Sequence, residues 1–149
     1  MKTSVATDTA TIVIFDTDCL KHKLEDDCDW WSAPVNEVPE INNGNILFLD
    51  VGADGTYEVE TVDELPANAE PVVEANLRNE SGRFFIGPGE DTTGEGLEPT
   101  AEYGSVFIEV PAGPYNVRAC LVDDSRVLLR LTRIDEFIRN TFTGSPTIA

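Results

Sequence analysis

Basic side chains are scarce in this sequence of 149 residues. It contains ten Lys and Arg and a single His against 28 Asp and Glu, so its formal net charge is −18 at pH 7. Nucleic acids and anionic membrane surfaces are bound through clusters of Lys and Arg. The shortage of Lys and Arg therefore predicts that neither nucleic acid nor a membrane surface is a partner. The surplus of carboxylates predicts a basic protein as the partner. The alternative is that the surplus carboxylates only keep the protein soluble or reflect a high-salt habitat.

Long apolar runs are also missing, and cysteines are few. No stretch approaches the ~20 apolar residues of a membrane span, and the apolar run near the N-terminus is too short for a signal peptide. Cys19, Cys28 and Cys120 are odd in number and have no C-x-x-C spacing, which argues against a disulfide framework. We therefore expect a cytoplasmic protein without cofactors, and leave a Cys19–Cys28 bridge open.

The acidity is distributed unevenly along the chain. Residues 1–104 hold 23 acids and 5 bases, whereas residues 105–149 hold five of each. An acidic surface is therefore expected to come from the first two thirds of the sequence.

Short runs of β-branched and aromatic residues recur between turn formers, and no sustained helical period interrupts them. The runs cover residues 10–15, 45–50, 56–62, 71–77, 83–86, 105–110, 115–122 and 126–134. Asp54-Gly55 predicts a hairpin between the second and third runs, and the last three runs predict a meander in which Glu109 pairs with Arg118.

This pattern predicts an all-β fold, an antiparallel β-sandwich or flattened barrel of seven to eight short strands with at most short helices. The length fits a single domain spanning residues 1–149. Residues 87–104 are rich in Gly, Pro, Thr and Glu, which predicts a long exposed loop.

Signals for catalysis or metal binding are weak. The only histidine, His22, stands between two lysines and has no motif of a Ser-His or Cys-His site around it. Residues 50–58 lack the alternating acids of a calcium loop, and a turn explains them better. We predict no catalytic residue and no metal site. A carboxylate-based or cation-dependent hydrolase, and a calcium-binding or accessory β-sandwich module, remain alternatives.

The stretch EDDCDWW, residues 25–31, combines the two features of a surface that binds a basic protein. Carboxylates attract the partner and bind Arg bidentately, and aromatic rings serve as anchors. The alternative is that one indole plugs the end of the sandwich, with the acids at its rim. We predict a partner-binding surface made of Asp26, Asp27, Asp29, Trp30, Trp31, Glu58 and Glu60, with Glu90, Asp91 and Glu95 as a second, mobile arm.

Several short motifs follow one another in an order typical of a known family. They are Phe15-Asp16, Asp29-Trp30, Gly44 to Phe48, Asp54 to Glu60, and V-P-x-G-x-Y-x-V from Val110 to Val117. In these the chain resembles the competence protein J type of small acidic β-proteins, which inhibit a DNA-entry nuclease, and is similar to immunity proteins encoded beside bacterial toxins. The resemblance implies a bacterial, non-enzymatic inhibitor of a basic toxin, a nuclease above all. A homodimer that forms through an exposed strand edge is a further possibility that the sequence leaves open.

Overall fold

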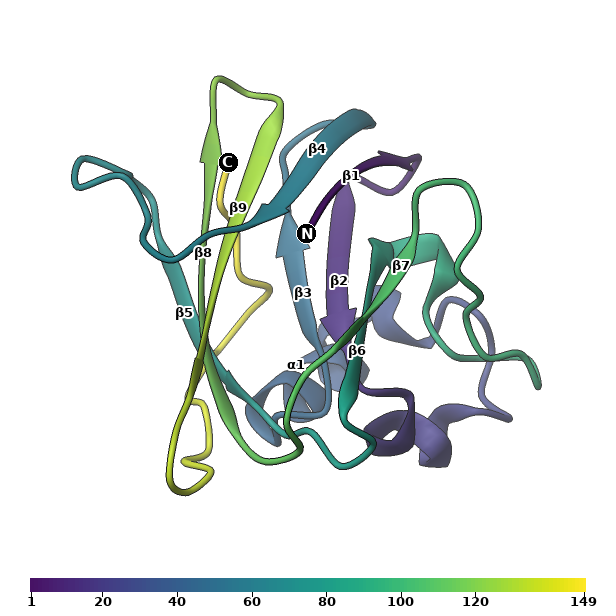
Figure 1. Ribbon diagram of the computed structural model, residues 1–149. Helices are drawn as coiled ribbons and strands as arrows, with labels where there is room; N and C mark the ends of the chain where they lie inside the picture. The colour runs from purple at the N-terminus through teal and green to yellow at the C-terminus, as the bar shows by residue number, and fades with distance from the viewer.

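The computed structural model describes all 149 residues and places nine β-strands in two packed layers (Figure 1). Sheet A has five strands, in the order β1 (Lys2–Thr7), β4 (Gly55–Thr61), β9 (Arg126–Arg133), β8 (Tyr115–Val122) and β5 (Val73–Leu77). Sheet B has four strands, in the order β3 (Leu47–Asp50), β2 (Thr11–Phe15), β6 (Arg83–Pro88) and β7 (Val106–Glu109). All neighbours are antiparallel except β4 and β9. The predicted antiparallel sandwich is confirmed, with nine strands and no closed barrel.

The core fills the space between the sheets and continues behind sheet B. Every residue of β2 is buried, because this apolar strand is covered on both faces. On the far side of sheet B lie the 3₁₀ helix η2 (Trp30–Ser32) and the helix α1 (Pro34–Asn42), which add Trp30 and Ile41 to the same hydrophobic cluster. Two further 3₁₀ helices are η1 (Thr17–Lys23) and η3 (Gly89–Asp91).

Two predicted connections were wrong. The turn at Asp54-Gly55 joins β3 to β4, yet these strands lie in different sheets, β3 beside β2 and β4 between β1 and β9. Likewise β7 belongs to sheet B while β8 and β9 form the expected hairpin in sheet A. Turn residues specify where the chain reverses, but they do not specify which layer receives the next strand.

The predicted pair of Glu109 with Arg118 fails for the same reason. Glu109 lies opposite Arg83 in sheet B, and the Arg118 guanidinium lies 3.6 Å from the Glu74 carboxylate in sheet A. A cross-strand pair needs two adjacent strands of one sheet.

Two elements had no clear signal in the sequence. Strand β1 contains a single large apolar residue, Val5, and lies at the edge of sheet A, where polar side chains are tolerated. Helix α1 begins with Pro34 in its first turn, where the missing N–H is not needed, although Pro34 and Pro39 favour a loop in the sequence. None of the helices is long and apolar enough to cross a membrane.

The C-terminal segment covers one edge of each sheet. The N–H of Ile148 donates to Asp50 O in β3, and the side chain of Asn140 bonds the N–H and the carbonyl of Asn76 in β5. Pairing through these two edges is blocked by the chain itself. A homodimer through β1 or β7 stays a prediction.

Candidate functional site

Two loops that are distant in the sequence lie side by side at one end of the sandwich, on the right of Figure 1. We call residues 24–32 and 89–104 the acidic loops. They hold four and five carboxylates respectively, nine in all, and no Lys or Arg. Their backbones are joined directly, because the N–H of Glu95 donates to Asp26 O at 2.7 Å and that of Gly96 donates to Leu24 O at 2.6 Å. The sequence-predicted carboxylates of both segments are thereby brought to the same end of the molecule.

Close packing between the acidic loops requires a glycine. A Cβ atom at Gly94 would lie 3.1 Å from Asp27 O and 3.1 Å from the Cα atom of Cys28, which is tighter than ordinary contact. The N–H of Cys28 in turn donates to the Glu95 carboxylate at 3.4 Å. The loops therefore form one structural unit rather than a fixed loop and a separate arm.

Trp30 is part of this support and is not an exposed anchor. Its side chain is buried, its Nε1–H donates to Thr93 O at 2.8 Å, and its ring packs edge-on against Phe48. Lys23 lies 4.8 Å above the same ring and pairs with Asp26 at 3.1 Å. The indole thus fixes one acidic loop to the other; its burial agrees with the alternative that one indole plugs the end of the sandwich, and its bond to the second loop was not predicted.

Trp31 lies on another surface. It is half-buried and stacks on Phe48 with ring centroids 5.1 Å apart. It lines a pocket beside helix α1 together with Phe48.

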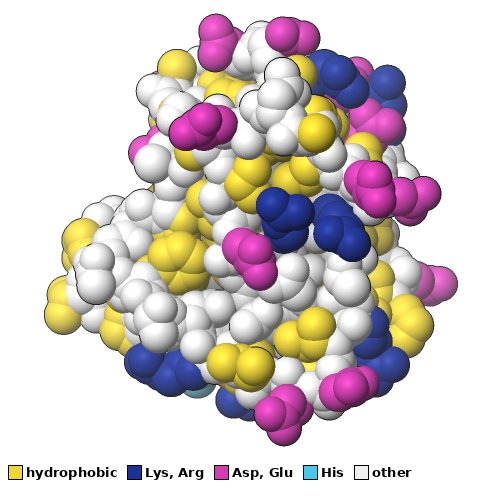
Figure 2. Space-filling view, turned by 90° about the vertical axis from the view of Figure 1, so that its left-hand side faces the viewer, with side chains coloured by type: hydrophobic (Ala, Val, Ile, Leu, Met, Phe, Trp, Pro, Cys, Tyr) yellow, Lys and Arg dark blue, Asp and Glu magenta, His cyan; other side chains and the backbone are white.

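Glu58 and Glu60 lie apart from the acidic loops, on β4 in sheet A. Glu58 pairs with Lys2 at 3.4 Å and with Arg126 at 3.3 Å, and Glu60 pairs with Arg126 at 3.3 Å. Figure 2, which views the molecule from the left-hand side of Figure 1, shows basic and acidic side chains interspersed on that face. These two glutamates are therefore largely neutralised by neighbours, unlike those of the acidic loops.

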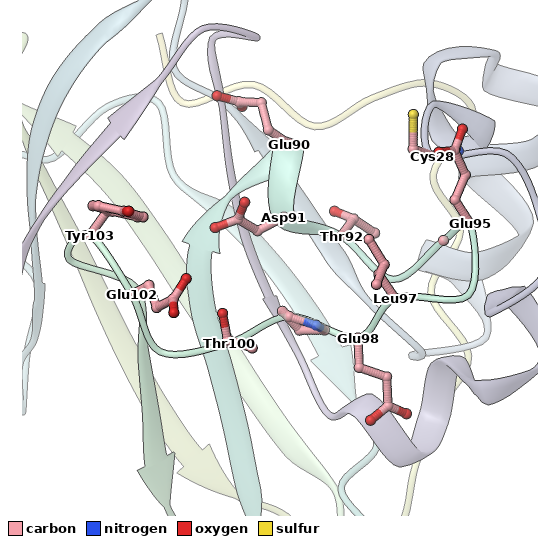
Figure 3. Close-up of a pocket in the computed structure, with 12 residues that line it drawn as sticks. Cys28, Glu90, Asp91, Thr92, Glu95, Leu97, Glu98, Thr100, Glu102 and Tyr103 are labelled. Atoms are coloured by element: carbon pink, nitrogen blue, oxygen red, sulfur yellow. The ribbon is translucent and has the colours of Figure 1, made fainter.

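A groove of about 250 Å³ opens along the second acidic loop. Its charged lining is entirely acidic, and consists of Glu90, Asp91, Glu95, Glu98 and Glu102 (Figure 3). Figure 3 shows the Asp91 and Glu102 side chains directed into the groove and Glu98 directed away from it. Such a concentration of like charge in one concave surface favours a cation.

Two exposed apolar side chains line this groove. Leu97 is 71% exposed and Tyr103 is 94% exposed, the largest exposure among the large hydrophobic residues. A tyrosine is a common anchor residue of protein interfaces. Sequence reasoning missed Leu97, Glu98, Glu102 and Tyr103, although an isolated Leu and Tyr within a polar, acidic segment were a visible signal.

The two carboxylates at the start of the groove differ in their ionisation. Desolvation alone would raise the pKa of Glu90, but hydrogen bonds from the Asp8 N–H and the Thr9 and Thr7 hydroxyls outweigh it and lower this pKa. Desolvation raises the pKa of Asp91, and the negative charges of Glu90 and Glu102 add to it, against a hydrogen bond from Ser105. Glu90 is thus fixed by these hydrogen bonds to the end of β1 and the turn that follows it, whereas an approaching cation would stabilise the ionised form of Asp91.

The other residues singled out in the sequence are the three cysteines and His22. All three cysteines are free thiols, and burial together with the nearby Asp16 and Glu80 charges raises the pKa of Cys19 to about 12. His22 contacts the buried Glu40 carboxylate. No group of three or more His, Cys, Asp or Glu side chains is arranged to hold a metal ion.

The fold and the acidic loops define a small, acidic β-sandwich with an exposed, carboxylate-rich groove at one end. The chain belongs to a family described as a family of unknown function, DUF6386, whose model matches residues 1–146. No curated protein matches it.

Two solved structures share this fold. One is ComJ from Bacillus subtilis, an inhibitor of the DNA degrading activity of NucA, with 9% identity and a TM-score of 0.56 over 90% of this chain and 96% of that chain. The other is described as crocagin biosynthetic gene J, with 16% identity and a TM-score of 0.53 over 91% of this chain and 96% of that chain. The resemblance to the competence protein J type is confirmed at the level of the fold.

Proposed function

We propose that this protein is an inhibitor that binds a basic protein, a nuclease, through the acidic loops. The observation that carries the proposal is the groove along the second acidic loop, which is lined by five carboxylates and no base and also by exposed Leu97 and Tyr103. A nuclease binds a polyanion, so its substrate-binding surface is positively charged. The carboxylates would occupy positions that phosphates otherwise take.

The fold likeness supports the same class of function. ComJ, which shares the two-sheet architecture, is an inhibitor of a nuclease. The acidic composition points independently to a cationic partner, because the nine carboxylates of the acidic loops contain only one ion pair with a basic side chain, that of Asp26 with Lys23.

The two kinds of side chain would act at different stages of binding. The unpaired carboxylates raise the rate of association, by ~10 to ~10³ fold for strongly complementary partners, and this effect weakens with salt. Tyr103 and Leu97 lose solvent on docking and slow dissociation.

The test compares two triple variants of equal charge change. Glu95→Gln, Glu98→Gln and Glu102→Gln remove charge from the groove, and Glu58→Gln, Glu60→Gln and Glu74→Gln remove it from sheet A. The partner is a basic nuclease that the wild-type protein is found to inhibit, and stopped-flow association is measured at several salt concentrations.

We expect the groove variant to associate about tenfold more slowly and with a weaker salt dependence, because three steering charges are gone. The sheet A variant should lose far less, since its carboxylates already pair with Lys2, Arg126 and Arg118. Equal losses in the two variants would show that only net charge matters and would refute the assignment to the acidic loops.

A further inference from the structure

A second pocket, of about 560 Å³, lies between helix α1, strand β3 and the turn that joins β1 to β2. We call it the α1 pocket. Its charged lining consists of Glu37 and Asp50 alone, with no Lys, Arg or His, and its aromatic lining consists of Trp31 and Phe48. It is separate from the groove described above, with which it shares no residue.

Glu37 is the unusual member of this pocket. Its side chain belongs to α1 and the residue is only 6% exposed, which is rare for a carboxylate without a basic partner. Within the protein its one hydrogen bond comes from the Ser145 hydroxyl to Oε1, and Oε2 receives none. A carboxylate oxygen that belongs to a largely buried side chain, lines a cavity and receives no donor from the protein is a position for a ligand donor.

The electrostatics of the pocket favour a cation. Burial raises the pKa of Glu37, the nearby Asp50 charge adds to this, and the Ser145 hydrogen bond opposes it. The Asp50 carboxylate is exposed at the rim and accepts the Gly52 N–H at 2.8 Å. A positive group placed between Glu37 and Asp50 would relieve both the desolvation and the mutual repulsion.

The aromatic lining selects among cations. Trp31 and Phe48 stack with ring planes 22° apart and present an indole at the pocket. A guanidinium is planar, weakly hydrated and able to stack on an aromatic ring while it donates two N–H groups to a carboxylate, whereas an ammonium is strongly hydrated and donates as a point charge. A planar cation therefore matches this combination best.

We propose that the α1 pocket receives an arginine side chain, with its guanidinium beside Trp31 and its N–H groups on the Glu37 and Asp50 carboxylates. That this arginine belongs to the basic partner rests on the proposed function. The pocket adjoins the acidic loops, because Thr9 lines it and donates to Glu90, which lines the groove. A partner that covers the acidic loops would thus reach the α1 pocket with an arginine at the margin of the interface.

The test uses a small probe and needs no partner. N-acetyl-arginine methylamide is titrated into the ¹⁵N-labelled protein, with the lysine and the uncharged citrulline derivatives in parallel. The reporter is the indole Nε1–H of Trp31, which has no acceptor in the protein, and the Nε1–H of Trp30, bonded to Thr93 O, is the internal reference.

The expected result is saturable movement of the Trp31 signal by the arginine probe, with a millimolar dissociation constant, while the Trp30 signal stays fixed. Glu37→Gln, which keeps the Ser145 bond, and Asp50→Asn at the exposed rim should each weaken binding by about tenfold. Glu58→Gln, in sheet A, should change nothing. If Glu37→Gln fails to fold, weaker binding of the arginine probe by Asp50→Asn tests the site alone.

Absence of saturation with the arginine probe, or equal binding of the citrulline probe, would overturn the site. Equal binding of the lysine probe would overturn the choice of arginine. A positive titration together with unchanged nuclease binding by the groove variant would keep the pocket and refute the acidic loops as the nuclease-binding surface, so the two failures are distinguishable.

Discussion

Replacement of Asp16 should disturb the fold strongly, although this residue is polar and lies just after the end of strand β2. It is 1% exposed, and its Oδ2 accepts the N–H groups of Glu80 at 2.6 Å and Ser81 at 2.8 Å. Its Oδ1 accepts the Ser81 hydroxyl at 2.6 Å and the N–H of Asp18 at 3.0 Å. One carboxylate thus ties the β5–β6 turn and the start of η1 to the end of β2. These bonds account for Asp16 without any bound cation.

The magnitude follows from these four bonds. In Asp16→Asn the amide N–H₂ must face at least one N–H group that now has no acceptor, and the remaining bonds lose their charge. Because a hydrogen bond to a charged group contributes about 1.5–3 kcal/mol, we expect a loss of about 3 kcal/mol in the free energy of unfolding. Asp18→Asn is the matched control, since its pair with Lys21 lies at the surface and is worth about 0.5 kcal/mol or less.

The loss should depend on pH. Burial alone would raise the pKa of Asp16, but the hydrogen bonds from Ser81, Glu80 and Asp18 outweigh it and hold this pKa below its usual value of 3.8. A depressed folded-state pKa contributes stability that is present above the unfolded-state pKa and lost as the pH falls through the folded-state value. The difference between wild type and Asp16→Asn should therefore be full at neutral pH and shrink below about pH 4.

Urea unfolding followed by circular dichroism, at neutral pH and at a series of acidic values, measures both quantities. Two results would refute the reasoning. One is a cost for Asp16→Asn no larger than that for Asp18→Asn, and the other is a difference that stays constant across the acidic range.

Three further predictions concern the acidic loops. Trp30→Phe should lower the free energy of unfolding by about 1–3 kcal/mol, because Thr93 O loses its buried donor, and an unchanged urea midpoint would contradict this. Leu97→Ala with Tyr103→Ala should leave thermal stability unchanged, since both side chains are exposed, yet weaken partner binding about tenfold or more in calorimetry; equal affinity would exclude them as anchors. Asp91→Asn should raise the melting temperature near neutral pH, because the raised pKa of Asp91 means that folding disfavours its ionised form. That gain should vanish below its usual pKa of 3.8, where the carboxyl is protonated in both states, and its persistence in acid would contradict the assignment.

How far the sequence predicts this fold depends on whether a feature is local. The buried strand at residues 11–15 and the β8–β9 hairpin follow from runs of apolar residues and short turns. The division of the strands between two sheets does not follow from such local signals. It depends on which layer accepts β4 and β8, and that choice is made by packing among segments far apart in the chain.

The candidate site shows the same limit. The acidity of residues 25–29 and 90–102 is visible as composition, so part of the site was predicted. The neutralisation of Glu58 was not predicted. Its partner Arg126 is 68 residues away and reaches it only because β4 pairs in parallel with β9. Burial of Trp30 was a stated alternative, but its bond to Thr93 O could not be foreseen from spacing.

The most direct test of the binding surface is hydrogen–deuterium exchange of this protein, free and in complex with the nuclease. The account predicts that binding slows exchange in residues 24–32 and 89–104 and leaves strands β8 and β9 unchanged. Protection confined to the face of sheet A, with none in the acidic loops, would contradict it.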